Sequence, residues 1–239
     1  MNGTGENGDS VLVVARQGSA PAAPMDNTTY TANAAFSSGD TTVPGSFVVY
    51  KGSGTSVNVT GLSAGTEYYF AVYEFNGSTT PNYLQAGAPV ASRTTLATEP
   101  SIQASGMAIS SPAEVSMSGF TWTAGNGVGR ILVAKAGAPV DSFPVDGVTY
   151  TGGTNFGTAS AEIGTGNYVL WVGTGTPNRI SSLARDTVYH FRLFEYNGSG
   201  DAINYNTSAA TGNPISQTTM AANPGSAVSD LALSNIGTD

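Results

Sequence analysis

The sequence predicts an all-β protein built from tandem β-sandwich repeats. Charged residues make up only 10% of the 239 residues and glycines number 31, so the sequence does not favour long amphipathic helices. Short apolar runs rich in Val, Tyr and Phe alternate with clusters of Gly, Asn, Asp and Pro, a pattern typical of sandwich strands and their turns. The third observation is an internal repeat with a period of about 120 residues, which indicates tandem units.

The repeat appears in most of the main apolar runs, which are expected to be strands. Each unit then closes with an Asn-Tyr pair. A match of this length predicts two copies of one fold. The matched runs are Val11–Gly18 with Arg130–Gly137, Phe47–Tyr50 with Tyr168–Trp171, Leu62–Ser78 with Leu183–Ser199, and Asn82–Tyr83 with Asn204–Tyr205.

The pattern Leu-x-x-x-Thr-x-Tyr-x-Phe occurs in both copies and resembles the segment that enters strand F of fibronectin type III domains. The resemblance implies that Tyr68 and Tyr189 form the corner hydrogen bond and that Trp122 lies in the core on strand B. The variant Phe-Glu-Tyr-Asn-Gly-Ser is similar to repeats of exported surface proteins of Bacteroidetes-type bacteria. That resemblance implies a spacer or adhesive module in an extracellular or cell-surface location.

The repeats divide the chain into three parts. Residues 1–97 are expected to form a first fibronectin-III-like repeat that lacks strands A and B, and residues 98–220 a second, complete repeat. Residues 221–239 are expected to form a linker followed by strand A of a third repeat or by a donor strand, because 224–234 mirror 100–110.

Composition argues against two classes of partner. The net charge is −8 and only eight Lys and Arg are spread along the chain, whereas nucleic-acid binding needs clustered cations. No run approaches the roughly 18 apolar residues of a membrane helix. We therefore expect neither nucleic-acid binding nor membrane insertion, and the absence of cysteine excludes disulfides and thiolate metal sites.

The residues that catalysis requires are sparse. The single histidine, His190, falls on strand F, and most carboxylates fall at turn positions, where turn chemistry explains them. No dense run of aspartates suggests a calcium loop. The sequence predicts no catalytic residue, no cofactor and no metal, and the chain is expected not to be an enzyme. The turn carboxylates are Asp9, Asp26, Asp40, Asp146 and Asp201.

A glutamate ends the inward-facing row of strand F in both repeats. Counting by twos from the corner tyrosine leads to Glu74 and Glu195, while Arg16 and Lys135 occupy matching places on the neighbouring strand C. This predicts half-buried pairs, Glu74 with Arg16 and Glu195 with Lys135, that fix strand register. In the alternative, each glutamate accepts backbone N–H groups of the Asn-Gly turn that follows it.

The outward row of strand F carries aromatic residues in both repeats. Exposed aromatics in a row stack on sugar rings or pack against a partner, so this row is a candidate binding surface. In the alternative, the long insertion between strands C and F folds over this face and buries it. The row consists of Tyr69, Tyr73 and Phe75 in the first repeat and Phe194 and Tyr196 in the second.

These features favour a non-catalytic structural or adhesive module of a secreted or cell-surface repeat protein. Without strands A and B, the first repeat would expose an apolar face and unpaired edges. Either the missing strands belong to flanking parts of a longer array, or the tail strand of a like subunit inserts and builds a head-to-tail filament. One tail strand does not replace both A and B. The alternative function is a carbohydrate-binding accessory module of a larger exported enzyme, with a surface glycan as partner.

Overall fold

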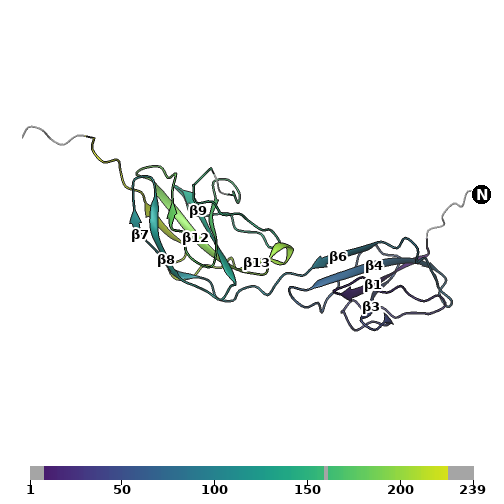
Figure 1. Cartoon of the computed structure of the whole chain (residues 1–239). Coiled ribbons are helices and arrows are strands. Elements are labelled where there is room, and N and C mark those ends of the chain that lie inside the picture. Colours follow the sequence, from purple (N-terminus) through teal and green to yellow (C-terminus); the bar gives the residue numbers. More distant parts are fainter. Residues whose placement is uncertain (1–7, 159–160, 226–239) are drawn as a thin grey trace, which may run out of the picture.

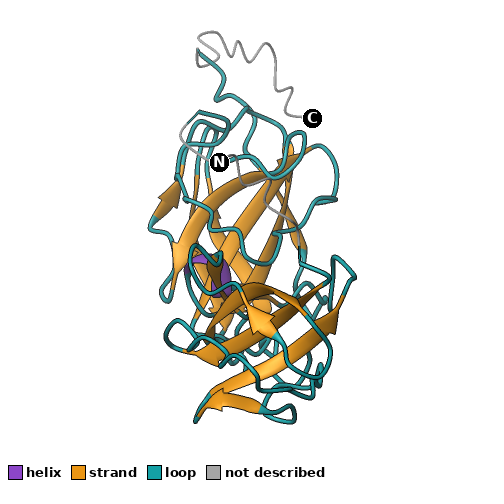
Figure 2. Cartoon of the chain, turned by 90° about the vertical axis from the view of Figure 1, so that its right-hand side faces the viewer, coloured by secondary structure: helices purple, strands orange, loops and turns teal. Residues whose placement is uncertain are grey.

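The computed structural model describes residues 8–158 and 161–225, and their regular structure consists of strands and one short 3₁₀ turn, η1 (Gly200–Ala202). The prediction of an all-β chain is confirmed. Two lobes follow one another along the chain, with β1–β6 in the first and β7–β14 in the second (Figures 1 and 2). The predicted strand A at the C-terminal end falls on 226–239, outside the described residues.

The first repeat forms one six-stranded antiparallel sheet. Its order is β2-β3-β1-β4-β5, and β6 pairs with the other part of β4. In the strand nomenclature of fibronectin type III domains, β1 is strand C, β3 is C′, β4 is F and β6 is G. The bounds are β1 (Ser10–Gln17), β2 (Thr41–Val43), β3 (Ser46–Gly52), β4 (Glu67–Asn76), β5 (Asn82–Tyr83) and β6 (Val90–Thr94).

The second repeat forms two sheets, one with the order β10-β9-β12-β13 plus β14 on β12, the other with the order β11-β8-β7. Strands A, B and E therefore face strands C′, C, F and G, which is the fibronectin-type-III-like arrangement. The bounds are β7 (Ser105–Pro112), β8 (Met117–Thr123), β9 (Gly129–Ala136), β10 (Tyr168–Gly173), β11 (Arg179–Ile180), β12 (Val188–Asn197), β13 (Asn204–Tyr205) and β14 (Ile215–Thr218).

In the second repeat, both faces of the β9–β12 sheet are buried. On one face, Phe191 and Leu193 pack in a cluster with Met107 of β7 and with Met117 and Phe120 of β8. On the other face, residues of β9 and β12 pack under the insertion that joins β9 to β10, which contributes Val140, Tyr150 and Ile163. Six consecutive residues at the start of β9 are buried for this reason.

In the first repeat only one face of the corresponding sheet is covered. Tyr30 from the insertion between β1 and β2, together with Tyr83, packs on Leu12, Val14 and Tyr73. The opposite face carries Val11, Val13, Phe70 and Val72, which are all half-buried. The described residues of the first repeat contain no counterpart of β7 and β8, so this apolar face has no second sheet.

The connection between the repeats is short and held at both ends. The Leu96 carbonyl accepts a hydrogen bond from Gly65 N–H of the first repeat (2.9 Å). The next residue, Ala97, donates its N–H to the Ala202 carbonyl of the second repeat (2.8 Å).

Candidate functional site: the open face of the first repeat

The two repeats share the corner that begins strand F. The hydroxyl oxygen of Tyr68 accepts a hydrogen bond from Ser63 N–H (3.0 Å), and that of Tyr189 accepts one from Ala184 N–H (2.8 Å). Both tyrosines are almost fully buried. Trp122 of β8 is half-buried and packs against the cluster of the second repeat. The corners therefore place β4 and β12 equivalently, and differences between the repeats arise elsewhere.

Glu195 is fully buried, but its partner is Arg130 and not the predicted Lys135. The Arg130 Nε lies 2.8 Å from Glu195 Oε1. Lys135 instead pairs with exposed Asp141, its Nζ lying 2.7 Å from a carboxylate oxygen. The prediction was wrong because β9 and β12 are antiparallel, so the end of β12 stands opposite the start of β9.

Backbone donors complete the shell of Glu195, although not those of the turn that follows it. Gly125 and Gly127, in the loop between β8 and β9, donate their N–H groups at 2.8 and 3.1 Å. A Cβ on Gly127 would lie 2.6 Å from the carboxylate oxygen, so only glycine fits there. Burial of this charge is tolerated because the arginine and the two amides replace water.

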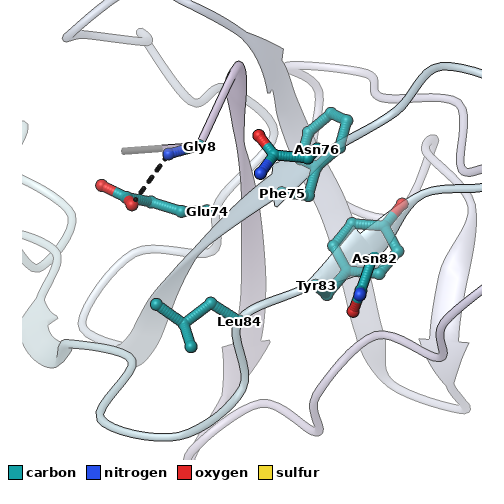
Figure 3. Close-up of a pocket in the computed structure, with 7 residues that line it drawn as sticks. All are labelled: Gly8, Glu74, Phe75, Asn76, Asn82, Tyr83 and Leu84. Atoms are coloured by element: carbon teal, nitrogen blue, oxygen red, sulfur yellow. Dashed lines mark hydrogen bonds between the residues drawn. The ribbon is translucent and has the colours of Figure 1, made fainter. Parts of the chain in front are cut away.

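The predicted pair of Glu74 with Arg16 is wrong for the same reason. Val11 stands opposite Glu74, and Arg16 lies five residues further along β1, or roughly 16 Å away at strand spacing. A valine thus occupies the place that arginine takes in the second repeat. The Glu74 carboxylate accepts a hydrogen bond from Gly8 N–H (3.2 Å; Figure 3).

The predicted aromatic binding surface is not an exposed strip. Tyr73 is 4% exposed, Phe75 is 5% exposed and Phe194 is fully buried, while Tyr69 and Tyr196 are half-buried. The insertions that follow β1 and β9 cover this row, as the alternative interpretation of the sequence predicted. The interpretation as a sugar-stacking surface is therefore corrected.

The exposed apolar surface is instead the row that sequence periodicity had assigned to the core. Val13 and Phe70 line a cavity of about 610 Å³, with Tyr50 and Val59 on its border. A second cavity, of about 260 Å³, shares Val11 and Val72 with the first and extends to Leu84 and Pro89. The two form one continuous apolar groove, which we call the open face.

A third cavity, of about 270 Å³, continues the open face beyond Glu74 and Leu84, which also border the second cavity. Its lining includes Asn76, Asn82 and Tyr83 at the ends of β4 and β5 (Figure 3). The open face therefore runs from an apolar groove to a polar end.

In the second repeat the corresponding space is filled by β8, by β7 and by the segment that leads into β7. The Gln103 side chain accepts a hydrogen bond from Glu195 N–H (2.9 Å) and donates one to the Asn206 carbonyl (2.8 Å). Ala104 and Met107 follow it into the core. The described residues of the first repeat contain no segment equivalent to this one, so the open face has no such cover.

Comparisons with known proteins bear on the fold alone. No protein-family model and no curated protein matches the chain. Among the similar solved structures is a two-fibronectin-type-III-domain segment from chicken tenascin, 16% identical, which covers 89% of this chain and 85% of that chain at a TM-score of 0.26. Within residues 8–158 and 161–225 there is no helix long and apolar enough to cross a membrane and no cluster of three metal-ligating side chains.

Proposed function

We propose that the chain is a non-catalytic structural segment of a secreted or cell-surface repeat protein, which joins like subunits head to tail by strand complementation. The units are 1–97 and 98–220, and 221–239 provides the linker and the donor strand. The observation that carries the proposal is the open face, an apolar groove whose counterpart in the second repeat is covered by β7 and β8. The donor strand would take the place of β7.

The tail carries apolar residues at the spacing of the lead strand, which is β7 with the segment that leads into it. In the second repeat Ala104, Met107 and Ile109 face the core, at intervals of three and two residues. The tail has Val228, Leu231 and Leu233 at the same intervals, outside the described residues. The odd interval needs a local break in strand alternation, which is where Gly106 has a φ of +59°.

The residue that corresponds to Gly106 is Asp230, and aspartate is among the non-glycine residues that tolerate left-handed φ. In the second repeat the start of the lead strand bonds to the segment before β14, because Gly106 N–H donates to the Thr211 carbonyl and Met107 N–H to the Gly212 carbonyl, each at 2.9 Å. A donor strand would bind the first repeat by backbone hydrogen bonds of this kind, while pockets for alternate side chains fix its register. A head-to-tail contact of this type produces linear polymers unless its rotation closes a ring.

The mass of the purified chain, measured by light scattering over a concentration series, tests the proposal. We expect the mass to rise with concentration and electron microscopy to show linear polymers. A chain without residues 223–239 should stay monomeric, because it keeps the open face but has no donor. A chain with Val72→Asp should also stay monomeric, because it keeps the donor but carries a charge in the groove.

A one-to-one mixture of the two monomeric variants sharpens the test, because each supplies what the other lacks. The mixture should form dimers that grow no further, whereas Val72→Thr, which keeps the side-chain shape, should weaken assembly much less. A wild-type chain that stays monomeric at every concentration would overturn the proposal and leave the open face to strands of a longer array.

A further inference from the structure

Two asparagines of the second repeat hold the linker that reaches it from the first. Asn204 Nδ2 donates to the Ala97 carbonyl and Asn197 Nδ2 to the Thr98 carbonyl, each at 2.8 Å. The Ala97 N–H donates to the Ala202 carbonyl, also at 2.8 Å. These contacts bind main-chain groups, so they recognise an extended backbone and not a particular side chain. We call the two asparagines and the Ala202 carbonyl the linker clasp.

The first repeat contains the same groups in the same places. Asn76 stands opposite Asn82 in the register of β4 and β5, as the two clasp asparagines do in β12 and β13. Asn76 Oδ1 accepts a hydrogen bond from Asp9 N–H (2.8 Å), and the Oδ1 of Asn197 accepts the equivalent bond from Val128 N–H (3.0 Å). The amide of Asn76 is therefore anchored as in the clasp, with Nδ2 as its remaining donor group.

In the first repeat this clasp faces solvent. Asn76 and Asn82 are both exposed and line the polar end of the open face (Figure 3). A glycine follows strand F in both repeats with a left-handed φ, +86° for Gly77 and +80° for Gly198. A Cβ on Gly198 would lie 2.9 Å from Ala97 Cβ, so the linker packs directly on that glycine. Gly77 offers the same bare surface.

The chain also contains a second segment of the kind that the clasp binds. Residues 218–224 read Thr-Thr-Met-Ala-Ala-Asn-Pro, and residues 94–100 read Thr-Thr-Leu-Ala-Thr-Glu-Pro. Thr95 Oγ1 donates to the Ser63 carbonyl (2.6 Å), and Thr219 Oγ1 donates to the Ala184 carbonyl (2.7 Å). The second segment thus leaves its repeat as the linker does, and residues 221–224 are exposed.

We infer that the clasp of the first repeat binds the backbone of Ala221 and Ala222 of a second copy of the chain. By the pattern of the internal linker, Asn82 Nδ2 donates to the Ala221 carbonyl and Asn76 Nδ2 to the Ala222 carbonyl, while Ala221 N–H donates to the Thr80 carbonyl. The inference rests on the proposed head-to-tail assembly and adds its polar anchor. The clasp places the residues after Pro224 at the mouth of the groove that takes the donor strand.

Replacing each clasp asparagine by aspartate in the full chain tests the inference. The aspartate keeps the acceptor oxygen and the shape but loses the N–H donor and turns a charge toward the incoming carbonyl. Because a hydrogen bond contributes about 0.5–1.5 kcal/mol, Asn82→Asp should weaken assembly about 3- to 10-fold and Asn76→Asp with Asn82→Asp about 10- to 100-fold. The charge-matched control is Asn178→Asp at an exposed site of the second repeat.

A change on the donor side shows whether the contact is direct. Ala221→Pro removes the N–H that would bind the Thr80 carbonyl, and combined with Asn82→Asp it should cost less than the product of the two single effects. Assembly that Asn82→Asp leaves equal to the Asn178→Asp control would overturn the clasp but leave head-to-tail assembly standing. A wild-type chain that never assembles would overturn both.

Discussion

The two repeats have the same central sheet and the same corner tyrosine, but they differ in how many faces of that sheet are covered. In the second repeat β7 and β8 cover one face and the β9–β10 insertion covers the other, so only the first residue of β12 is exposed. In the first repeat only the insertion side is closed. The insertion, and not the second sheet, is therefore the common element that stabilises each unit.

The residue opposite the buried glutamate follows this difference. Arg130 is 5% exposed and pairs with the fully buried carboxylate of Glu195. Because β7 and β8 exclude water from this face, the buried carboxylate needs a cation beside it. Val11 occupies the same position on the open face, where Glu74 keeps access to solvent. In the second repeat, where β7 and β8 cover this face, the position opposite the glutamate holds a charged partner. In the first repeat, where the face has no such strands, the same position holds an apolar residue.

The largest expected effect comes from breaking the buried pair. Arg130→Met should destabilise the second repeat by about 3–5 kcal/mol, because it leaves Glu195 buried without its cation. Val11→Met, the matched change on the open face, should alter the first repeat by less than about 1 kcal/mol. Urea unfolding followed by tryptophan fluorescence reports the second repeat alone, since the chain's two tryptophans, Trp122 and Trp171, both lie there.

Equal effects of the two methionine substitutions would contradict the comparison. For the first repeat the readout is hydrogen exchange of peptides from residues 8–97, because that part of the chain has no tryptophan.

A smaller difference is expected for the aliphatic residues two positions before each glutamate. Leu193→Ala should cost the second repeat about 3 kcal/mol, because it leaves a cavity under β7 and β8. Val72→Ala should destabilise the first repeat of the monomeric chain by less than about 1 kcal/mol, since the Val72 side chain is already half-exposed to solvent. Hydrogen exchange at low protein concentration measures the second value.

The effect of Val72→Ala on the stability of the first repeat should depend on protein concentration. In assembled chains the same substitution should become more costly, because the donor strand then covers the residue. A Val72→Ala effect that is as large in monomers as that of Leu193→Ala would mean that the open face is closed in the free chain.

Much of the fold follows from patterns that the sequence displays directly. The repeated Leu-x-x-x-Thr-x-Tyr-x-Phe segment locates strand F and its corner, and Tyr68 and Tyr189 make the corner contact in the structure. Periodicity also assigns the correct residues to each face of β4. It does not say which face is covered, because that depends on where a long insertion folds.

The site residues were harder to predict for two physical reasons. Equivalent places on two strands do not imply contact, since antiparallel pairing brings opposite ends together, and so Arg16 and Lys135 were wrongly paired. The clasp asparagines do recur in both repeats, at Asn76 and Asn82 and at the matching positions of the second. They do not stand out as a binding site, because Asn76 begins the predicted Asn-Gly turn after strand F and asparagine is common in turns.

The smallest expected effect concerns the turn between β7 and β8, which only the second of the described repeats contains. Glu114 of this turn accepts a hydrogen bond from Asn223 N–H (2.9 Å) and pairs with Arg185, whose Nε lies 2.8 Å away. The hydrogen bond from Asn223 and the pairing with Arg185 lower the pKa of the Glu114 carboxyl. A lowered pKa means that the contact stabilises the folded chain above the ordinary carboxyl pKa of about 4.3 and is lost as the pH falls through the folded value.

Asn223 is the residue before Pro224, so this contact helps to set the direction in which the tail leaves the second repeat. The amide of Asn223 should exchange more slowly in the wild type than in Glu114→Gln at pH 6, and the two rates should converge as the pH approaches 2.5. Comparing the two chains at each pH removes the intrinsic pH dependence of exchange. Equal exchange rates of the Asn223 amide in the two chains at pH 6 would mean that another group holds the tail.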